Sequence, residues 1–477
     1  LTLNGSTAQT FAGGFVGTTD NSGSALPSFV VESGVELVAN ADIEVEGAFT
    51  ANGAFTLDGN GSSSLTLESG GTLTGLLTIS TNGDLSAGGG VTANGNVVNN
   101  GTLSLDGAFA ANGDLTNSGT FNANGNGVTL SGGTAQDVSG FDSANPFSDL
   151  TISTSGTSAT FSSDTDVEGV FSIGSGASGD FSSQDLTVTG NFSNDGTFTA
   201  GTTTFLSPPS GTSVVSTTTS LQFNNYSNTT AGDVQLDNSI SVAGDLDVSG
   251  SGSLTGTGVI LNGGAAQTLS IPDGESVPAL SVTNNSTAQF NTNNVAVTID
   301  AVTVATGSTF SLSNTSASTV SVTGTVLANG GLLLSNNDAT LQVGGDLTVA
   351  GSFDAREDPV ILNGSAAQDI GSIDLTFFDL VIDNSSGVSN AVEIASGSAS
   401  IVRDLLLTEG EFATNGNLTL LSTYDGSDIV DAAVTQDDGS ATLGSGTLAS
   451  SNDTAQRVVD GTGGGTTGDS STGTLGD

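Results

Sequence analysis

Short runs of alternating apolar and polar residues follow one another along most of the chain, separated by Gly, Asn, Asp and Ser. Residues 42–47, 186–190 and 341–349 are three such runs. Strict alternation over about four to eight residues, bounded by turn formers, indicates strands with one buried face. Since no stretch shows a helical period, the pattern predicts an all-β protein.

The runs leave almost no room for crossover helices, so parallel strands would have to stack because the chain winds on itself. We therefore predict an elongated parallel β-solenoid (β-helix) built from degenerate repeats, with roughly 20 residues per turn. Tandem β-sandwich domains are the alternative, because a larger unit recurs about every 100 residues. Sandwich domains would be joined by linkers, whereas the alternation continues unbroken from Val35 to Leu420.

A seven-residue phrase marks the larger unit. It reads Leu-Asn-Gly-Ser-Ala-Ala-Gln in its last copy, and its four copies occupy residues 3–9, 130–136, 261–267 and 362–368. Such recurrence indicates one supersecondary theme, copied and stacked. The final Gln either forms a side-chain ladder between units or bonds nearby backbone in a turn. Because several coils separate the copies, we favour the turn.

The repetition also sets the predicted domain organisation. We expect a continuous solenoid over residues 1–421, a C-terminal β region over 422–460, and a tail rich in Gly, Thr and Asp over 461–477. Phe, with 22 residues, is the only abundant aromatic. It mostly lies close to Gly or Asn turns, so we expect Phe rings to stack inside the coils.

The charge is the most unusual property of the composition. The chain has 49 acidic residues and only 3 basic ones, all Arg, which gives a net charge of −46. Several acids alternate with apolar residues, which places them in outward rows. The rows are Asp42, Glu44 and Glu46; Asp164, Asp166 and Glu168; and Asp245 and Asp247. Like charges at this spacing repel and salt screens them, so the rows indicate a salt-loving source organism or a calcium-rich exterior, with an ordinary solvated acidic face as the alternative. The acid excess without Lys is similar to that of a halophile's protein. Nucleic acids are disfavoured as partners, since phosphate recognition needs basic residues.

The residue inventory narrows the available chemistry. There is no His, Cys or Lys, so Ser-His or Cys-His nucleophilic pairs, Schiff bases and the usual zinc sites cannot be built. Paired carboxylates that cleave glycosides remain conceivable. The acids lie in repeated rows, however, with no single dense cluster, so we do not expect an enzyme or a catalytic cofactor.

No cofactor is expected, and calcium or other counterions are the candidate bound species, since carboxylate oxygens are the ligands that Ca²⁺ prefers. Two acidic loops supply candidate ligands. They are Asp425, Asp428 and Asp431 in one loop and Asp354, Glu357 and Asp358 in the other. Neither loop has EF-hand spacing, and solvated acidic loops are the simpler interpretation.

The repeated phrase, the element that follows it at 378–387 and the later Val-x-Gly-x-Leu runs together resemble secreted β-helical repeat proteins of Bacteroidota-type bacteria. More loosely, they resemble filamentous-haemagglutinin-type adhesins. The resemblance implies a secreted, extracellular or cell-surface structural protein, either a self-assembling filament subunit or an adhesin stalk, with surface polysaccharide as a further partner. A carbohydrate-binding or carbohydrate-cleaving β-helix is the alternative. No apolar run is long enough to span a bilayer.

The ends of the chain suggest head-to-tail self-association. Leu1 and Leu3 lie directly inside the first repeat, without a visible cap, while Val458 and Val459 precede the flexible-looking tail. Uncapped solenoid edges expose unpaired backbone groups. We therefore expect the end of one copy to pair with the start of the next by strand addition, which yields a filament when the contact does not close.

Overall fold

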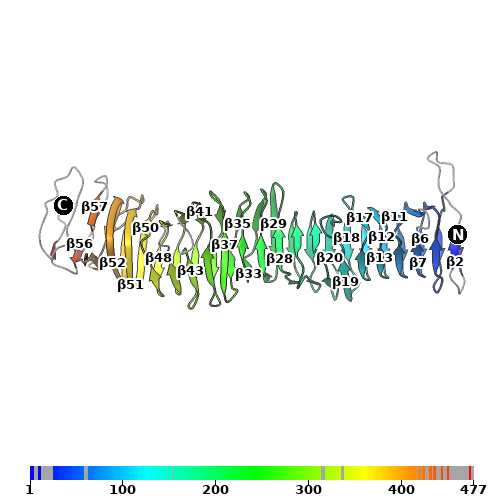
Figure 1. Cartoon of the computed structure of the whole chain (residues 1–477), viewed down its shortest axis with the longest axis horizontal. Helices are drawn as coiled ribbons and strands as arrows, with labels where there is room; N and C mark the ends of the chain where they lie inside the picture. The colour runs from blue at the N-terminus through cyan, green and yellow to red at the C-terminus, as the bar shows by residue number, and fades with distance from the viewer. Residues whose placement is uncertain are drawn as a thin grey trace. The chain divides into compact units, whose positions relative to one another are not determined.

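The computed structural model describes most of the chain. The described residues are 1–4, 9–11, 25–58, 63–153, 155–312, 317–334, 338–415, 417–420, 422–424, 429–431, 433–436, 442–443, 448–450 and 472–473. Over these residues the protein is all-β, and parallel strands stack in about 18 turns to form a β-solenoid (Figure 1). This confirms the predicted fold class over the β-sandwich alternative. Among the same residues, no helix is present that could cross a membrane.

Two compact units divide the chain. The first contains Leu1–Ser227 and Ala231–Asp237, and the second contains Asn228–Thr230 and Asn238–Asp477. Each unit is described separately below.

The first unit winds through several parallel sheets. Within it, sheet A runs in the order β1 (Thr2–Leu3), β3 (Phe29–Val31), β6 (Phe49–Ala51), β9 (Gly71–Leu73), β12 (Val91–Ala93), β15 (Phe109–Ala111), β18 (Gly127–Leu130), β20 (Asp149–Ile152), β23 (Phe171–Ile173), β26 (Phe192–Asn194), β29 (Thr212–Thr217) and β32 (Asp233–Leu236). Sheet B runs β2 (Gln9–Phe11), β4 (Leu37–Ala39), β7 (Phe55–Leu57), β10 (Leu77–Ile79), β13 (Val97–Asn99), β16 (Leu115–Asn117), β19 (Ala135–Ser139), β21 (Ser158–Phe161), β24 (Ser178–Asp180) and β27 (Thr197–Thr199). The third face of the coil is sheet C early and sheet D later. Sheet C contains β5 (Ile43–Val45), β8 (Ser63–Leu67), β11 (Gly83–Gly88), β14 (Thr102–Asp106) and β17 (Thr120–Asn122), and sheet D contains β22 (Thr165–Val167), β25 (Leu186–Val188), β28 (Thr203–Leu206) and β31 (Asn225–Ser227).

The second unit contains three main parallel ladders, one in sheet D and two in sheet E. Its part of sheet D contains β34 (Leu246–Asp247), β37 (Ala266–Ser270), β40 (Thr287–Phe290), β43 (Thr309–Ser311), β46 (Gly331–Leu333) and β49 (Phe353–Asp354). Sheet E supplies the other faces, with β33 (Ile240–Val242), β36 (Val259–Leu261), β39 (Leu280–Val282), β42 (Val302–Val304), β45 (Val326–Ala328) and β48 (Leu347–Val349) in one ladder, and β41 (Ala296–Ile299), β44 (Thr319–Val322), β47 (Thr340–Val343) and β50 (Pro359–Leu362) in another.

From residue 368 onward the coils have a different shape. β51 (Gln368–Asp383) and β52 (Val392–Glu409) each run through positions where earlier coils break into separate strands. Their register shifts at several points, for example between Phe377 and Asp379, which bends the strands without a full turn. Parallel pairing then continues past the predicted boundary at 421, because β57 (Ala433–Gln436) pairs with β52, and β59 (Leu448–Ser450) pairs with β54 (Leu418–Leu420).

The length of a turn varies along the chain. Leu103 pairs with Phe121, an offset of 18 residues, whereas Ala135 pairs with Ser158, an offset of 23. The predicted value of roughly 20 falls between these offsets. Extra residues are accommodated at the corners, which explains why the repeat phrases are unevenly spaced.

The core follows directly from the alternation. Most three-residue strands bury their first and third side chains and leave the second half-exposed. Phe rings pack inside the coils as predicted: Phe29 meets Phe49 of the next coil edge to face with ring centroids 5.7 Å apart, and Phe49 meets Phe55 of its own coil edge to face at 5.5 Å. Such aromatic pairs stabilise the core beyond the area that they bury.

Glycine occupies corners where one coil lies directly on the backbone of the coil below. Gly53, Gly75, Gly95 and Gly113 form one such column. A Cβ atom at Gly95 would lie 2.7 Å from the carbonyl carbon of Gly75, which is well inside van der Waals contact. Any larger residue must therefore push two coils apart against their hydrogen-bonded ladders.

This column gives a first test. Gly95→Ala should lower the free energy of unfolding by about 1–3 kcal/mol, because the added methyl group overpacks the corner. Gly127→Ala is the matched control: its Cβ would lie 3.5 Å from the Asp149 Cβ, an ordinary contact, and should cost less than about 0.5 kcal/mol. Urea denaturation of the two variants measures the difference, and equal losses would contradict a steric role for the column.

Candidate functional site

The Gln of the repeat phrase is the centre of a recurring polar arrangement. Gln267 is only 1% exposed. Its side-chain amide donates to two carbonyl oxygens of the preceding coil, Val242 O at 2.9 Å and Gly244 O at 2.6 Å. Its Oε1 accepts the backbone N–H of Gly263 at 3.1 Å, within the same phrase. One side chain thus closes its own turn and ties that turn to the coil below.

The next residue adds a second tie between the same coils. The N–H of Thr268 donates to Oδ1 of Asp245 at 2.7 Å. Asp245 directly follows Gly244, whose carbonyl accepts the Gln amide. Both bonds run from a donor in the later coil to an acceptor in the preceding coil, one through the Gln side chain and the other through the Asp side chain, so the pair fixes the register of the two coils. We call this arrangement the Gln–Asp interlock.

The interlock recurs at the copies that end in Gln136 and Gln368, whereas Gln9 donates to Asn4 O at 3.3 Å within its own phrase. Gln136 donates to Ala111 O and Gly113 O, and Asp114 accepts from the N–H of Asp137. Gln368 does the same with Val343 O and Gly345 O, and Asp346 accepts from the N–H of Asp369. All three Gln side chains are 1% exposed. The Gly and Asp partners belong to a Gly-Asp-Leu sequence that begins 23 residues before each Gln, and the other carbonyl partner lies two residues before that sequence.

The predicted turn role of the phrase is confirmed, because each Gln bonds backbone within its own turn. The tie to the preceding coil is not part of that prediction. The sequence does contain a signal for it, namely the constant spacing between Gly-Asp-Leu and Ala-Gln, while the spacing between phrases varies. A constant spacing inside a variable repeat indicates two segments that must meet.

Carboxylates bridge coils at other corners as well. Asp164 accepts from the N–H of Asp185 at 2.9 Å, and Asp185 accepts in turn from the N–H of Thr203 at 2.9 Å. Asp273 accepts from the N–H of Ala296 at 2.8 Å. A carboxylate that accepts a backbone N–H forms a charge-assisted hydrogen bond. Part of the large acidic content therefore has a structural role.

Asparagine side chains also bridge neighbouring coils in the first unit. The sequence pattern did not lead us to predict this role. Asn99 and Asn117 are buried at strand ends, and the amide of Asn99 donates to Oδ1 of Asn117 at 2.7 Å. Oδ1 of Asn99 also accepts the N–H of Gly101 at 3.2 Å. The recurring Asn-x-Gly sequence is the signal, since Asn satisfies backbone at the corner that Gly makes possible.

The acidic rows lie outward, as predicted. In the row Asp164, Asp166 and Glu168 all three side chains are exposed or half-exposed, while Val167 is buried. Partial burial raises the pKa of Asp166, and the negative charges of Asp142, Asp164 and Glu168 raise it further, although a hydrogen bond with Thr187 opposes this. Burial likewise raises the pKa of Asp369, with the carboxylates of Asp346 and Glu393 adding to it.

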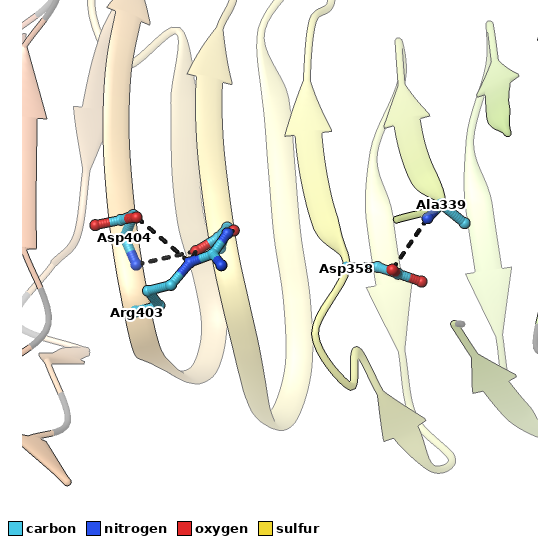
Figure 2. Close-up of polar contacts among 5 residues, drawn as sticks. Ala339, Asp358, Arg403 and Asp404 are labelled. Carbon is cyan, nitrogen blue, oxygen red and sulfur yellow. Dashed lines mark hydrogen bonds and ion pairs between the residues drawn. The ribbon is translucent and has the colours of Figure 1, made fainter. Parts of the chain in front are cut away.

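Arg403 forms a two-point ion pair in the second unit. Its guanidinium binds both carboxylate oxygens of Asp379, with Nε to Oδ1 at 2.8 Å, and Nε lies 3.4 Å from Asp404 Oδ2. Figure 2 shows Arg403 and Asp404 on the long strands of this region. Asp379 is 6% exposed and also accepts the N–H of Asp404, and the guanidinium covers the ring of Phe378 at 4.6 Å from its centroid. This pair lies at the register shift of β51, where it satisfies a buried carboxylate.

The candidate calcium ligands occupy different environments. Asp358 is buried, and its Oδ1 accepts the N–H of Ala339 at 3.1 Å, as Figure 2 shows. Asp354 is exposed and pairs with Arg356, Nε to Oδ2 at 3.7 Å, and Glu357 is exposed. The described residues contain no group of three acidic side chains placed to hold a metal. Asp425 and Asp428 lie outside the described residues, as does the side chain of Asp431, so calcium binding stays a prediction.

The proposed assembly residues are described at one end only. Leu3 pairs with Val31 through the parallel bridge between β1 and β3, and the terminal amino group of Leu1 donates to Ser28 O at 2.8 Å. Val458 and Val459 lie outside the described residues. Head-to-tail association therefore stays a prediction.

Comparison of the chain with protein-family models, with curated proteins and with solved structures finds no match. The resemblance to bacterial β-helical surface proteins accordingly stays a prediction from the sequence phrases.

The interlock gives a second test. Gln267→Leu keeps the volume but leaves two carbonyl groups and one N–H of the corner without their partner. We expect the free energy of unfolding to fall by at least about 2 kcal/mol, since each buried unsatisfied group costs about 1–3 kcal/mol. Gln235→Leu, at an exposed position of the first unit, should change it by less than about 0.5 kcal/mol. Similar losses in chemical denaturation of the two variants would rule out the interlock as a stabilising element.

The acidic row gives a third test. Because the folded-state pKa of Asp166 lies above its unfolded value, the charged carboxylate lowers stability at neutral pH, and stability is regained as the pH falls through the raised pKa. Asp166→Asn should therefore melt at a higher temperature than the wild type at pH 7. The advantage should shrink in molar salt, which screens the neighbouring charges, and disappear below the ordinary pKa of Asp. A constant advantage from pH 7 to pH 3 would show that charge is not its cause.

Proposed function

We propose that this protein is an extracellular structural protein, a stalk or filament subunit at the cell surface, adapted to high salt. The observation that carries the proposal is the repeated commitment of polar side chains to backbone groups of the neighbouring coil. Gln267, Asp245 and their equivalents hold successive turns together at the same corner. Side chains used in this way resist separation of the coils along the stacking direction.

The charge distribution supports the environment part of the proposal. A net charge of −46 with outward acidic rows repels itself in dilute solution and is screened at high ionic strength. The bridging carboxylates add a reason to retain Asp at corners, since each one accepts a backbone N–H from the next coil. The acidic residues therefore have two roles: some hold neighbouring coils together, and the exposed ones keep the protein soluble at high salt.

The first partner that we propose is a second copy of the same chain. A solenoid grows by adding one parallel strand to each ladder, so a second copy can in principle continue the stack by strand addition. A contact of this kind does not close on itself and produces filaments. Surface polysaccharide is a second proposed partner, for which the stalk would act as a support.

Electron microscopy tests the proposal directly. Immunogold labelling of intact producing cells should place the protein outside the cell envelope, and negative staining of the purified native material should show fibres or projecting stalks. Labelling confined to the cell interior would overturn the proposal. Hydrolysis of a polysaccharide by the purified chain would also overturn it, in favour of a carbohydrate-active β-helix.

A further inference from the structure

The repeat phrase is tied to the coil that follows it as well as to the coil that precedes it. The N–H of Gly264, the fourth residue of the phrase, donates to Oγ of the buried Ser286 at 2.9 Å. Ser286 lies in the next coil, because the residue after it, Thr287, pairs with Ala266. Since Gln267 bonds the preceding coil, one phrase joins three consecutive coils.

The same second tie occurs at the other two copies that have the interlock. The N–H of Gly133 donates to Oγ1 of the buried Thr157 at 2.9 Å. At the last copy, the amide of the buried Asn384 donates to Ala366 O at 2.7 Å and to Oε1 of Gln368 at 2.8 Å. We call each phrase, together with its ties to both neighbouring coils, a clamp. The three clamps are centred on Gln136, Gln267 and Gln368.

Further buried ties lie next to the first and the last clamp. In the first unit, the amide of the buried Asn117 donates to Gly140 O at 2.8 Å, which continues the buried Asn pair into the coil of the first clamp. In the second unit, the buried Asp379 binds Arg403 and lies on β51, the strand that also contains the Gln of the last clamp. These ties add to the bonds that hold the clamped coils.

The coils between the clamps are held differently. The N–H of Ala296 donates to Asp273 at 2.8 Å, but this bond lies at an exposed corner. When it breaks, water replaces the lost partner, whereas a broken bond inside a clamp leaves buried polar groups unsatisfied. The Ser318 hydroxyl donates to Thr292 O at 3.1 Å and joins two coils. The clamps differ from both bonds because each clamp joins three coils.

These differences matter because each coil of a solenoid contacts only its neighbours. An opening coil therefore uncovers the next one, and unfolding can travel along the stack. It should advance easily through coils that are held weakly and pause where several buried bonds must break together. A clamp presents such a group of bonds from either direction.

We propose that the clamps are stops at which unravelling pauses, so that the chain unfolds under load in steps of defined length. One step contains the 101 residues from Gln267 to Gln368, which lie within the second unit. At about 3.5 Å per extended residue, this step releases about 350 Å of chain. The inference goes beyond the structural function proposed above, because it concerns how the fold opens and does not depend on where the protein is located.

The experiment stretches the full-length chain between its two ends with optical tweezers, in molar salt to screen the acidic rows. The wild type should unfold in discrete steps, one of which has a contour length of about 350 Å. Gln267→Leu removes the bonds of the second clamp to the preceding coil, so this step should disappear and a longer one should replace it. Leu341→Ala is the control. It removes a buried side chain between two clamps, so it should lower the melting temperature and leave the step length unchanged.

Circular dichroism establishes whether each variant is folded before it is stretched. If Gln267→Leu does not fold, Ser286→Ala takes its place: it removes only the tie to the following coil and should lower the force at this stop. A wild type that unravels without steps would overturn the proposal. So would a step length or stopping force that the clamp variant leaves unchanged, or a step length that changes in Leu341→Ala. None of these results bears on the location of the protein or on its fibres, so failure here is distinct from failure of the proposed structural function.

Discussion

The backbone of each coil must lie about 4.8 Å above the backbone of the next, because that is the distance at which parallel strands exchange hydrogen bonds. In flat strands the ladder meets this constraint by itself. At corners the backbone hydrogen bonds of the ladder are interrupted. The residues there must still hold two backbones as close together as they are in the strands. Glycine columns such as Gly75 under Gly95 provide the space, and Gln, Asp and Asn side chains supply the missing hydrogen bonds. Composition follows from this geometry, since a chain with many corners needs many of these residues.

The corner solution changes along the chain. In the first unit, Asn99 and Asn117 bond across coils inside the core. Where the repeat phrase occurs, a buried Gln near the start of the strand, at a different corner from Asn99 and Asn117, reaches two carbonyl groups of the coil below. Near β51 and β52 the corners become bends within long strands, and the Arg403–Asp379 pair satisfies the buried carboxylate at one of them. In each case a polar group that would be costly to bury alone is matched with a partner, which keeps the register of the coils unique.

Alternation was enough to predict the all-β solenoid and the outward position of acids such as Asp164 and Asp166, because side-chain direction in a strand depends only on local period. The partners of Gln267 could not be derived from the phrase itself, since the phrase carries no information about which residues lie one coil below. That information is the length of the intervening coil, and coil length differs from coil to coil: it is 18 residues between Leu103 and Phe121, 23 between Ala135 and Ser158 and 28 between Gln9 and Leu37. The alignment of one coil with the next therefore depends on residues far apart in the sequence. At the Gln residues, the constant spacing from Gly-Asp-Leu to Gln is the sequence signal for this alignment.

The same dependence on register explains how one chain can present unlike surfaces. Because consecutive coils align residue for residue, a preference repeated once per turn becomes a continuous row, and rows on different sheets are independent of one another. On sheet A, Thr50, Thr72 and Thr92 align into one uncharged row, whereas on sheet C the acid Glu44 aligns with Thr66. In a solenoid, the hydrogen-bond ladder that fixes coil spacing also converts a local sequence rule into a surface of defined chemistry.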